Sequence, residues 1–254
     1  MRALPSTVAA PAAWRTVDLV SDLHLHLADG ATFAAFRRYL RDTPADAIFL
    51  LGDIFEVWIG DDAAAPGSFE SDCAQRLRQA AASRALFFLH GNRDFLLGQA
   101  WLRESGVTLL HDPCLLDWHD RRWLLSHGDA LCLGDTDYQR FRAEVRTPAW
   151  QQAFLARPLE ERRRIADGLR QASEAHKAGG ADYADADPEL ADAWLSRARA
   201  DTLVHGHTHR PAEHRTPAGK RRLVLSDWDL LATPPRAEAL RIGADGSASR
   251  ISLV

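Results

Sequence analysis

Five short apolar segments of this chain each end in a small polar cluster, usually beside a glycine. The segments are Trp14–Val20, Ala47–Leu51, Ala85–Leu89, Arg122–Leu125 and Thr202–Val204. Their length and their apolar, partly β-branched composition predict buried strands of an α/β protein. The residues that follow them include Asp, Asn and His, which are costly to bury unless they share a partner. Since ligands bind beyond the carboxyl ends of strands in open α/β sheets, we expect the five clusters to form one site.

The cluster after the fifth segment, Val204 to Pro211, contains three histidines within five residues. Side chains at positions i and i+2 of an extended chain lie on the same side, so we expect His207 and His209 to face one point. Asp22 and His24 have the same spacing. Imidazole is a common ligand of transition metals, which makes these residues a candidate metal site. The alternative for the histidines alone is a solvated turn.

Length and composition limit the other possibilities. The chain has 254 residues, enough for one large α/β domain or one domain with an inserted piece. A net charge of -4 gives no reason to expect a nucleic-acid partner. Three cysteines without CxxC spacing indicate neither a disulfide framework nor a zinc knuckle, and they favour a reducing compartment. Without a recognisable signal peptide or a long apolar run, we expect a soluble, cytoplasmic chain.

The remaining regular elements follow from hydrophobic spacing. Ala31–Leu40 and Phe69–Ala82 have the spacing of helices. Arg221–Ser226, Ala237–Ile242 and Ser249–Leu253 are predicted as strands that complete a second sheet.

An arginine-rich region lies between the fourth and fifth polar clusters. From Arg140 to Arg170 there are eight arginines and four acidic residues, with apolar residues at helical spacing between them. One interpretation is a solvated helical insertion whose arginines pair with its own acids. The other is a cap that binds an anionic, partly apolar substrate or rests on a membrane surface.

Taken in order, the five polar clusters resemble the motif set of the calcineurin-like metallophosphoesterases, DxH, GD, GN[HR]D, H and GHxH. In this sequence the motifs are Asp22-x-His24, Gly52-Asp53, Gly91-Asn92-Arg93-Asp94, His127 and Gly206-His207-x-His209. The resemblance implies a four-layer α/β/β/α sandwich with an inserted helical cap. We expect residues 1–134 and 201–254 to form the core and residues 135–200 to form the cap.

The same resemblance implies a binuclear metal site. One metal would take Asp22, His24, Asp53 and His209, and the other would take Asp53, Asn92, His127 and His207. Asp53 would then bridge two ions about 3.5–4 Å apart. Nitrogen and oxygen ligands without thiolate suit manganese, iron or zinc better than calcium, and the resemblance favours two Mn²⁺ ions.

Arg93 narrows the chemistry. Many similar proteins have histidine at this position, where it protonates an alkoxide leaving group. Arginine stays charged and cannot act as a general acid, but it can neutralise a phosphoryl group. It therefore favours cleavage of a pyrophosphate, whose leaving group is itself a phosphate. The alternative is a structural salt bridge with Asp94.

Longer segments narrow the resemblance further. Gly52–Asp62, His205–Pro211, and Ser126–Cys132 followed by Asp135 and Tyr138 are similar to the UDP-2,3-diacylglucosamine diphosphatases of lipid A biosynthesis. This similarity implies hydrolysis of UDP-2,3-diacylglucosamine to UMP and 2,3-diacylglucosamine 1-phosphate, by attack of metal-activated water on the α-phosphorus. It also implies a helical cap that holds the acyl chains.

Resemblance extends to residues that contact substrate. It implies catalytic roles for Arg93 and Asn92 and substrate contacts from Asn92, Arg93, Asp135, Tyr138, Ser173 and His207. A lysine that the family pattern places near Gly180 is missing, and Lys177 is the candidate to replace it. Glu56 and Trp58 are interpreted as supporting and packing residues.

The partners follow from the same similarity. We expect a monomer that binds a lipid-linked UDP-sugar at the cytoplasmic face of the inner membrane, to which it attaches peripherally. The rival enzymes are a soluble nucleotide pyrophosphatase and a phosphodiesterase of the same superfamily. A non-catalytic scaffold with this fold would be expected to have lost ligands, yet all seven ligand positions carry suitable residues.

Overall fold

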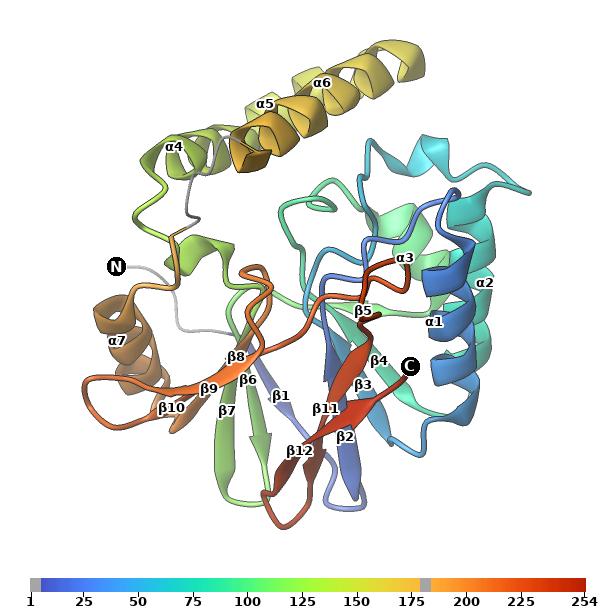
Figure 1. Cartoon of the computed structure of the whole chain (residues 1–254). Helices are drawn as coiled ribbons and strands as arrows, with labels where there is room; N and C mark the ends of the chain where they lie inside the picture. Colours follow the sequence, from blue (N-terminus) through green and yellow to red (C-terminus); the bar gives the residue numbers. More distant parts are fainter. Residues whose placement is uncertain (1–5, 179–183) are drawn as a thin grey trace.

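The computed structural model describes residues 6–178 and 184–254, with side chains omitted for residues 172–178. Within this part of the chain, two six-stranded sheets face each other, as Figure 1 shows. The first sheet has the order β12-β11-β2-β3-β4-β5 and the second has the order β1-β6-β7-β8-β10-β9.

The first sheet contains three of the five predicted strands at its centre. Strands β2 to β5 are parallel neighbours, and β11 and β12 extend the sheet in antiparallel fashion. Their bounds are β2 Thr16–Val20, β3 Ala47–Leu50, β4 Ala85–Phe88, β5 Thr108–Leu109, β11 Glu238–Gly243 and β12 Ala248–Ser252.

The second sheet contains the other two predicted strands, β7 and β8, which are parallel neighbours. β6 pairs antiparallel with β7, and β10 pairs parallel with β8. The bounds are β1 Ser6–Ala9, β6 Cys114–Trp118, β7 Arg121–Ser126, β8 Thr202–His205, β9 Ala212–Arg215 and β10 Arg221–Val224.

One sequence expectation about the sheets is wrong. The last three predicted strands do not complete one sheet, because β10 joins the second sheet while β11 and β12 join the first. Leu240 of β11 pairs with Leu19 of β2, so β11 covers the edge that β2 would otherwise expose. Hydrophobic pattern predicts that a strand exists, but the choice of its neighbour depends on which edge is open.

Side chains from the inner faces of both sheets form the central core. Val17, Leu19 and Phe49 of the first sheet are fully buried with Leu116 and Leu125 of the second. Strands covered on both faces are expected to be continuously apolar, which explains segments such as Ala47–Leu50.

Helices cover the outer face of each sheet, so the predicted four-layer sandwich is confirmed. Buried residues of α1 (Gly30–Asp42), α2 (Phe69–Ala81) and α3 (Gln99–Ser105) form one cluster with the first sheet. Buried residues of α7 (Pro188–Ala198) form another cluster with the second sheet. Figure 1 shows the two helical layers on opposite sides of the sheets.

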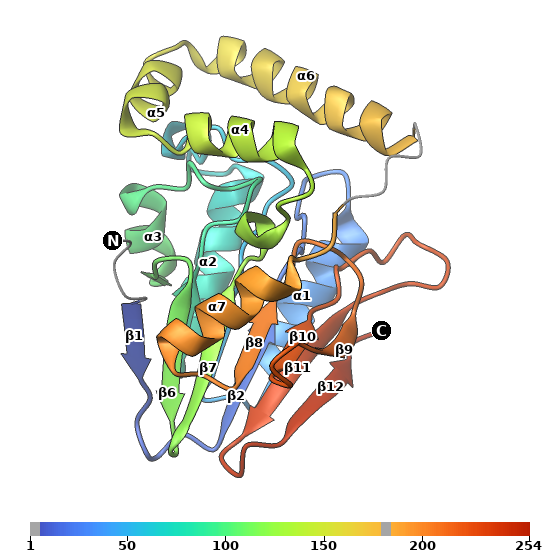
Figure 2. The ribbon, with the colours of Figure 1, turned by 90° about the vertical axis from the view of Figure 1, so that its left-hand side faces the viewer.

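Three helices lie above the ends of the sheets, as Figure 2 shows. They are α4 (Thr136–Val145), α5 (Pro148–Leu155) and α6 (Leu159–Ala178). The expected cap, residues 135–200, also includes α7, whose Leu195 packs on the second sheet. Short 3-10 helices occur at Asp61–Ala63 (η1) and Asp129–Leu131 (η2). Among the described residues, none of the helices has both the length and the apolar character that a membrane-spanning segment requires.

Arg162 fastens α6 to the core. Its side chain is buried and bonds to the carboxylate of Asp62 and to the backbone oxygen of Ile59. A buried guanidinium needs such partners, because an unpaired buried charge is strongly unfavourable.

Replacing Arg162 with Met is expected to loosen α6 while leaving the sandwich folded. The variant leaves the Ile59 carbonyl without its partner, which costs about 1–3 kcal/mol of docking free energy. Limited proteolysis should then cut residues 157–170 faster than in the wild type. Arg163→Gln is the matched control, because Arg163 is exposed and bonds to Glu160 of the same helix. Equal cleavage of the two variants would contradict this role.

Candidate metal centre

The polar clusters do meet where the strands of both sheets end. The seven candidate ligands and Arg93 follow β2 (Asp22, His24), β3 (Asp53), β4 (Asn92, Arg93), β7 (His127) and β8 (His207, His209). Within the second sheet, the backbone N–H of Gly206 donates to the carbonyl of His127 over 2.9 Å. Between the sheets, the backbone N–H of His207 donates to Asp22 Oδ2 over 2.9 Å. Polar residues therefore connect the strand ends of the two sheets, and the clusters form one site as predicted.

The local backbone differs from the expected extended chain. The φ angles are 53° at Asp22, 47° at His24, 53° at Asp53, 67° at His207 and 51° at His209. Asp22 and His24 converge through left-handed turns of the chain, so the explanation from strand alternation is wrong. His207 and His209 do not face one point as expected, because His207 contacts Asn92 whereas His209 contacts Asp22. Such conformations cost about 1–3 kcal/mol each and persist where surrounding contacts enforce them, which is frequent at functional sites.

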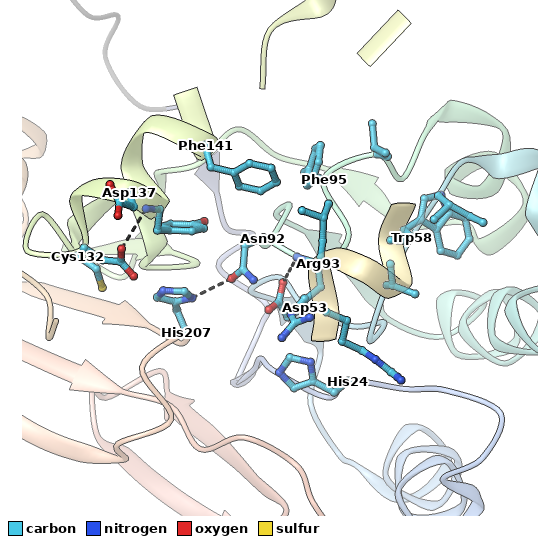
Figure 3. Close-up of a pocket in the computed structure, with 18 of the residues that line it drawn as sticks. His24, Asp53, Trp58, Asn92, Arg93, Phe95, Cys132, Asp137, Phe141 and His207 are labelled. Carbon is cyan, nitrogen blue, oxygen red and sulfur yellow. Dashed lines mark hydrogen bonds between the residues drawn. The ribbon is translucent and has the colours of Figure 1, made fainter. Parts of the chain in front are cut away.

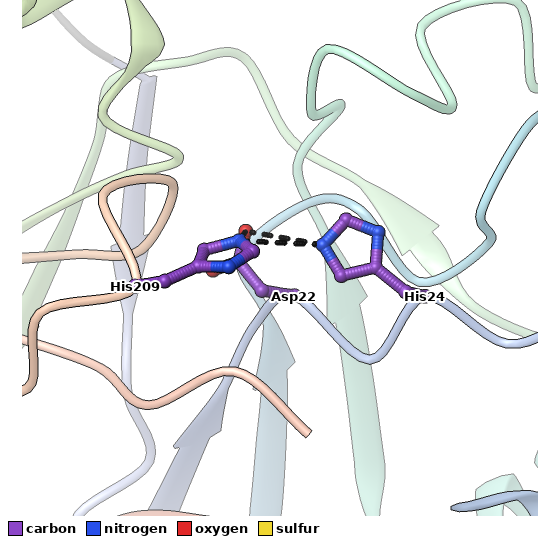
Figure 4. A group of neighbouring side chains, drawn as sticks. All are labelled: Asp22, His24 and His209. Atoms are coloured by element: carbon purple, nitrogen blue, oxygen red, sulfur yellow. Dashed lines mark hydrogen bonds and ion pairs between the residues drawn. The ribbon is translucent and has the colours of Figure 1, made fainter. Parts of the chain in front are cut away.

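One group of candidate ligands consists of Asp22, His24 and His209 (Figure 4). His209 Nε2 lies 3.3 Å from Asp22 Oδ1 and 3.3 Å from His24 Nε2. His24 Nε2 lies 3.9 Å from the same carboxylate oxygen. One ligand atom from each residue lies within 4.8 Å of the others, which suits a shared ion.

The other candidate ligands gather beside this group. Asn92 Oδ1 lies 2.9 Å from His127 Nε2 and 2.8 Å from His207 Nδ1, and Figure 3 shows Asn92 directed toward His207. His127 Nε2 also lies 3.7 Å from Asp53 Oδ1. Asp22, Asp53 and His127 again place ligand atoms within 4.8 Å of one another. The carboxylates therefore connect the two groups.

The far nitrogen of three rings has a partner outside the centre. His127 Nδ1 lies 2.9 Å from the carbonyl oxygen of Leu51, so it carries the proton and leaves Nε2 free for a metal. His24 Nδ1 lies 3.1 Å from Glu56, and His209 Nδ1 lies 3.7 Å from Asp227. Carboxylates behind ligating histidines fix the ring and increase its basicity.

Asp227 was missed from the sequence, although a signal was available. It follows strand β10 by three residues, so it is another polar residue beyond a strand end.

Glu56 was expected to support the site, and it does so from the loop after β3. It also lies 3.7 Å from Arg93 Nη1. Asp94, the alternative partner of Arg93, instead accepts hydrogen bonds from the backbone of Gly91 and Ile54.

The buried carboxylates of the centre need compensating positive charge. Burial opposes protonation of His127, but Asp53 and Asp22 outweigh it and raise the pKa of His127 to about 9. Burial would raise the pKa of Asp22, yet the neighbouring histidines, His209 first, hold it well below its usual range. Burial and Asp53 raise the pKa of Asp94 to about 7. Buried carboxylates this close together need positive charge, which either protonated histidine or a metal supplies.

Glycine at positions 91 and 206 leaves room for the carboxylates of the candidate site. A Cβ at Gly91 would collide with Asp53, and a Cβ at Gly206 would collide with Asp22 and Ser21. The donors are imidazole nitrogens, carboxylate oxygens and an amide oxygen, without thiolate. This set and its close packing fit two divalent transition-metal ions.

A cavity of about 670 Å³ extends from these residues to the cap. One end is lined by polar groups that include Asp53, Asn92, Arg93 and His207 (Figure 3). The other end is lined by side chains from the cap and the loop after β4, namely Phe95, Phe141, Trp150, Phe154 and Leu169. This lining suits a ligand that is anionic at one end and apolar at the other.

The expected substrate residues of the cap are placed unevenly. Asp135 and Tyr138 both line the cavity. Asp135 caps α4 by accepting a hydrogen bond from the backbone of Tyr138, whose hydroxyl donates to Asp129 over 2.6 Å. Ser173 and Lys177 belong to α6, but their side chains lie outside the described residues, as does Gly180.

The cap arginines fit the first interpretation, pairing with acids of the cap itself, only in part. Arg140, Arg157 and Arg163 pair with acids of the cap over one helical turn. By contrast, Arg142 and Arg162 form ion pairs with Asp129 and Asp62. Arginines therefore fasten the cap to the core as well as solvating its surface.

Comparisons with known proteins agree with this geometry. The model of the calcineurin-like phosphoesterase family matches residues 15–211. A UDP-2,3-diacylglucosamine hydrolase of Chromohalobacter salexigens is 44% identical over 237 residues, which are 91% of this chain and 94% of that protein. One of Stenotrophomonas maltophilia (strain K279a) is 41% identical over 245 residues, covering 91% and 96%. One of Aromatoleum aromaticum is 45% identical over 217 residues, covering 82% and 87%.

Replacing Glu56 with Gln tests the support of His24. The amide keeps the shape of Glu56 but removes the charge behind the ring, so Mn²⁺ affinity should fall by about tenfold. Titration of the metal-free protein measures this. Glu189→Gln, an equal charge change at an exposed position of α7, should bind Mn²⁺ like the wild type. Wild-type affinity in Glu56→Gln would rule out the role.

Proposed function

Because this chain belongs to the calcineurin-like phosphoesterase family and, within it, to the family of the UDP-2,3-diacylglucosamine hydrolases, we propose that it hydrolyses UDP-2,3-diacylglucosamine. The products are UMP and 2,3-diacylglucosamine 1-phosphate, so the bond cleaved is the pyrophosphate. The observation that carries the proposal is the cavity, which continues from the candidate ligands into an apolar chamber under the cap.

The two ends of the cavity match the two parts of this substrate. Acyl chains gain about 0.8 kcal/mol for each buried methylene, and the aromatic side chains of the cap provide that environment. Trp150 stacks on Phe154 at 4.9 Å and packs near Phe95 at 6.1 Å, so the apolar wall is continuous. The diphosphate lies at the other end, against Asn92, Arg93 and the metal ligands.

The residues that would hold two metal ions are Asp22, His24, Asp53, Asn92, His127, His207 and His209. When bound there, two divalent ions, which we propose are Mn²⁺, would supply an activated water and charge neutralisation at the α-phosphate. Arg93 and Asn92 are the catalytic side chains. The guanidinium of Arg93 is held near Glu56 at the cavity wall, where it can bind phosphoryl oxygens and stabilise developing negative charge.

Contacts to the sugar and the phosphates come from Asn92, Arg93, Asp135, Tyr138, Ser173, Lys177 and His207. Lys177 supplies the positive charge that the family pattern places near Gly180. The support for Asp135, Tyr138 and His207 is that they line the cavity.

The enzyme works at the cytoplasmic face of the inner membrane, to which it attaches peripherally. Leu155 and Leu169 of the cap are 40% and 45% exposed, and Arg163 and Arg164 lie on the same helix as Leu169. Exposed apolar groups beside arginines are suited to the boundary between lipid headgroups and acyl chains. Such an arrangement brings the cap chamber to the source of the substrate.

The substrate assignment predicts strong selectivity for the acylated sugar nucleotide. Without acyl chains the ligand loses apolar contacts, so kcat/KM for UDP-glucose and for a diadenosine polyphosphate should be lower by about 100-fold or more. Product assays on the Mn²⁺-loaded protein measure the three rates. Equal rates would favour the soluble nucleotide pyrophosphatase, and the absence of any hydrolysis would favour a non-catalytic scaffold.

Replacing Arg93 with Gln tests its catalytic role. Losing a charge that stabilises the transition state should lower kcat by about 100-fold, with Mn²⁺ affinity unchanged. The matched control is Arg84→Gln, because Arg84 bonds to the carbonyl of Thr43 at the opposite ends of the strands from the candidate ligands. Normal kcat in Arg93→Gln would leave Arg93 without this role.

A further inference from the structure

A single buried carboxylate, Asp129, holds helix α4 against the loop that carries His127. The residue is fully buried at the start of η2, two positions after His127. Its Oδ2 accepts hydrogen bonds from Tyr138 Oη over 2.6 Å and from Arg142 Nε over 2.7 Å. Arg146 Nη2 lies 3.6 Å away. Tyr138, Arg142 and the C-cap residue Arg146 are spaced four residues apart, so they lie along one face of α4 and its C-terminal end.

The same face of α4 reaches two other ligand loops. Arg146 Nη2 donates to the carbonyl oxygen of Gly91 over 2.8 Å, directly before Asn92. The ring of Tyr138 stacks on the ring of His207, with centroids 5.8 Å apart and planes inclined by 28°. One helix face of the cap therefore contacts the loops of Asn92, His127 and His207. These three residues would hold one of the two metals, together with the shared Asp53.

These contacts are of a kind that holds a fixed geometry. Charge-assisted hydrogen bonds to a buried carboxylate are short and directional, and they lose their value if the helix shifts. Gln139 adds hydrogen bonds from its side-chain amide to the carbonyls of Asp129 and Cys132, over 2.8 and 3.1 Å. α4 is thus attached to the turn after His127 through both side chain and backbone.

We propose that Asp129, Tyr138, Arg142 and Arg146 form a positioning unit that couples the seating of α4 to the binding of the metal held by Asn92, His127 and His207. Coupling of this type is reciprocal, so occupancy of that metal site stabilises the seated cap helix and the seated helix stabilises the metal. The inference rests on the two-metal centre proposed above, and it is independent of the lipid part of the substrate.

The experiment uses full-length protein freed of metal and titrated with Mn²⁺ by calorimetry. Wild type should bind two ions, and Asp129→Asn should bind the first normally and the second about tenfold more weakly. Hydrogen exchange gives a second readout. Mn²⁺ should slow exchange of the α4 amides in the wild type and have little effect on them in Asp129→Asn.

Matched variants separate positioning from a loss of folding. Tyr138→Phe keeps the ring on His207 and removes only the hydroxyl, so the second ion should bind about fivefold more weakly. Glu144→Gln changes an exposed carboxylate of the same helix and should behave like the wild type. Adding Arg142→Gln to Asp129→Asn should cause less further loss than Arg142→Gln causes alone, because the two residues act as a pair.

Two outcomes would overturn the inference. They are normal binding of both ions by Asp129→Asn and Tyr138→Phe, and α4 exchange that does not respond to Mn²⁺ in the wild type. If the wild type nevertheless hydrolyses UDP-2,3-diacylglucosamine, the proposed function stands without the coupling. Coupled metal binding in a protein that leaves this substrate intact would support the inference and contradict the proposed function.

Discussion

Two buried carboxylates, Asp22 and Asp53, lie where the carboxyl ends of the strands of both sheets meet. The surrounding groups compensate their negative charge. Asp22 Oδ2 accepts hydrogen bonds from Ser21 and from the backbone of His207, while Asp53 accepts one from the backbone of Arg93. These bonds do not neutralise two negative charges, which is why the pKa of His127 rises to about 9 against the effect of burial. A pair of divalent ions removes that need and leaves the imidazoles neutral, in the form that ligates metal.

This arrangement requires unfavourable backbone conformations. Five candidate ligands adopt left-handed conformations, and the nearby glycines leave no room for a Cβ. Stable strands hold these loops, because β2 and β3 are buried on both faces between the central core and the outer helices. The strongly apolar sandwich thus supports strained polar loops at the ends of its strands, which is typical of binding and catalytic sites.

The apolar segments of the sequence predict most of the sandwich, and the polar residues that follow them predict where the candidate ligands gather. Buried strands such as Ala47–Leu50 are continuously apolar, and the polar residue that ends each one is conspicuous. Short or edge elements escape this pattern, including β1, the two-residue β5 and α3. The hydrophobic pattern does not reveal contacts between residues that are distant in the sequence. The contact of Asp227 with His209 and that of Arg142 with Asp129 are therefore seen only in the folded chain. The backbone conformation of the DxH and HxH segments could not be inferred from spacing, because alternation applies only to extended chain.

We expect the seven candidate ligands to hold two metal ions close enough to share Asp53. Electron paramagnetic resonance of the protein loaded with two equivalents of Mn²⁺ tests it most directly. Two ions about 3.5–4 Å apart and bridged by a carboxylate are expected to give the broad spectrum of an exchange-coupled pair, and Asp53→Asn should abolish that spectrum. Two independent mononuclear Mn²⁺ signals, or saturation at one equivalent, would show that the seven residues do not form a shared two-metal centre.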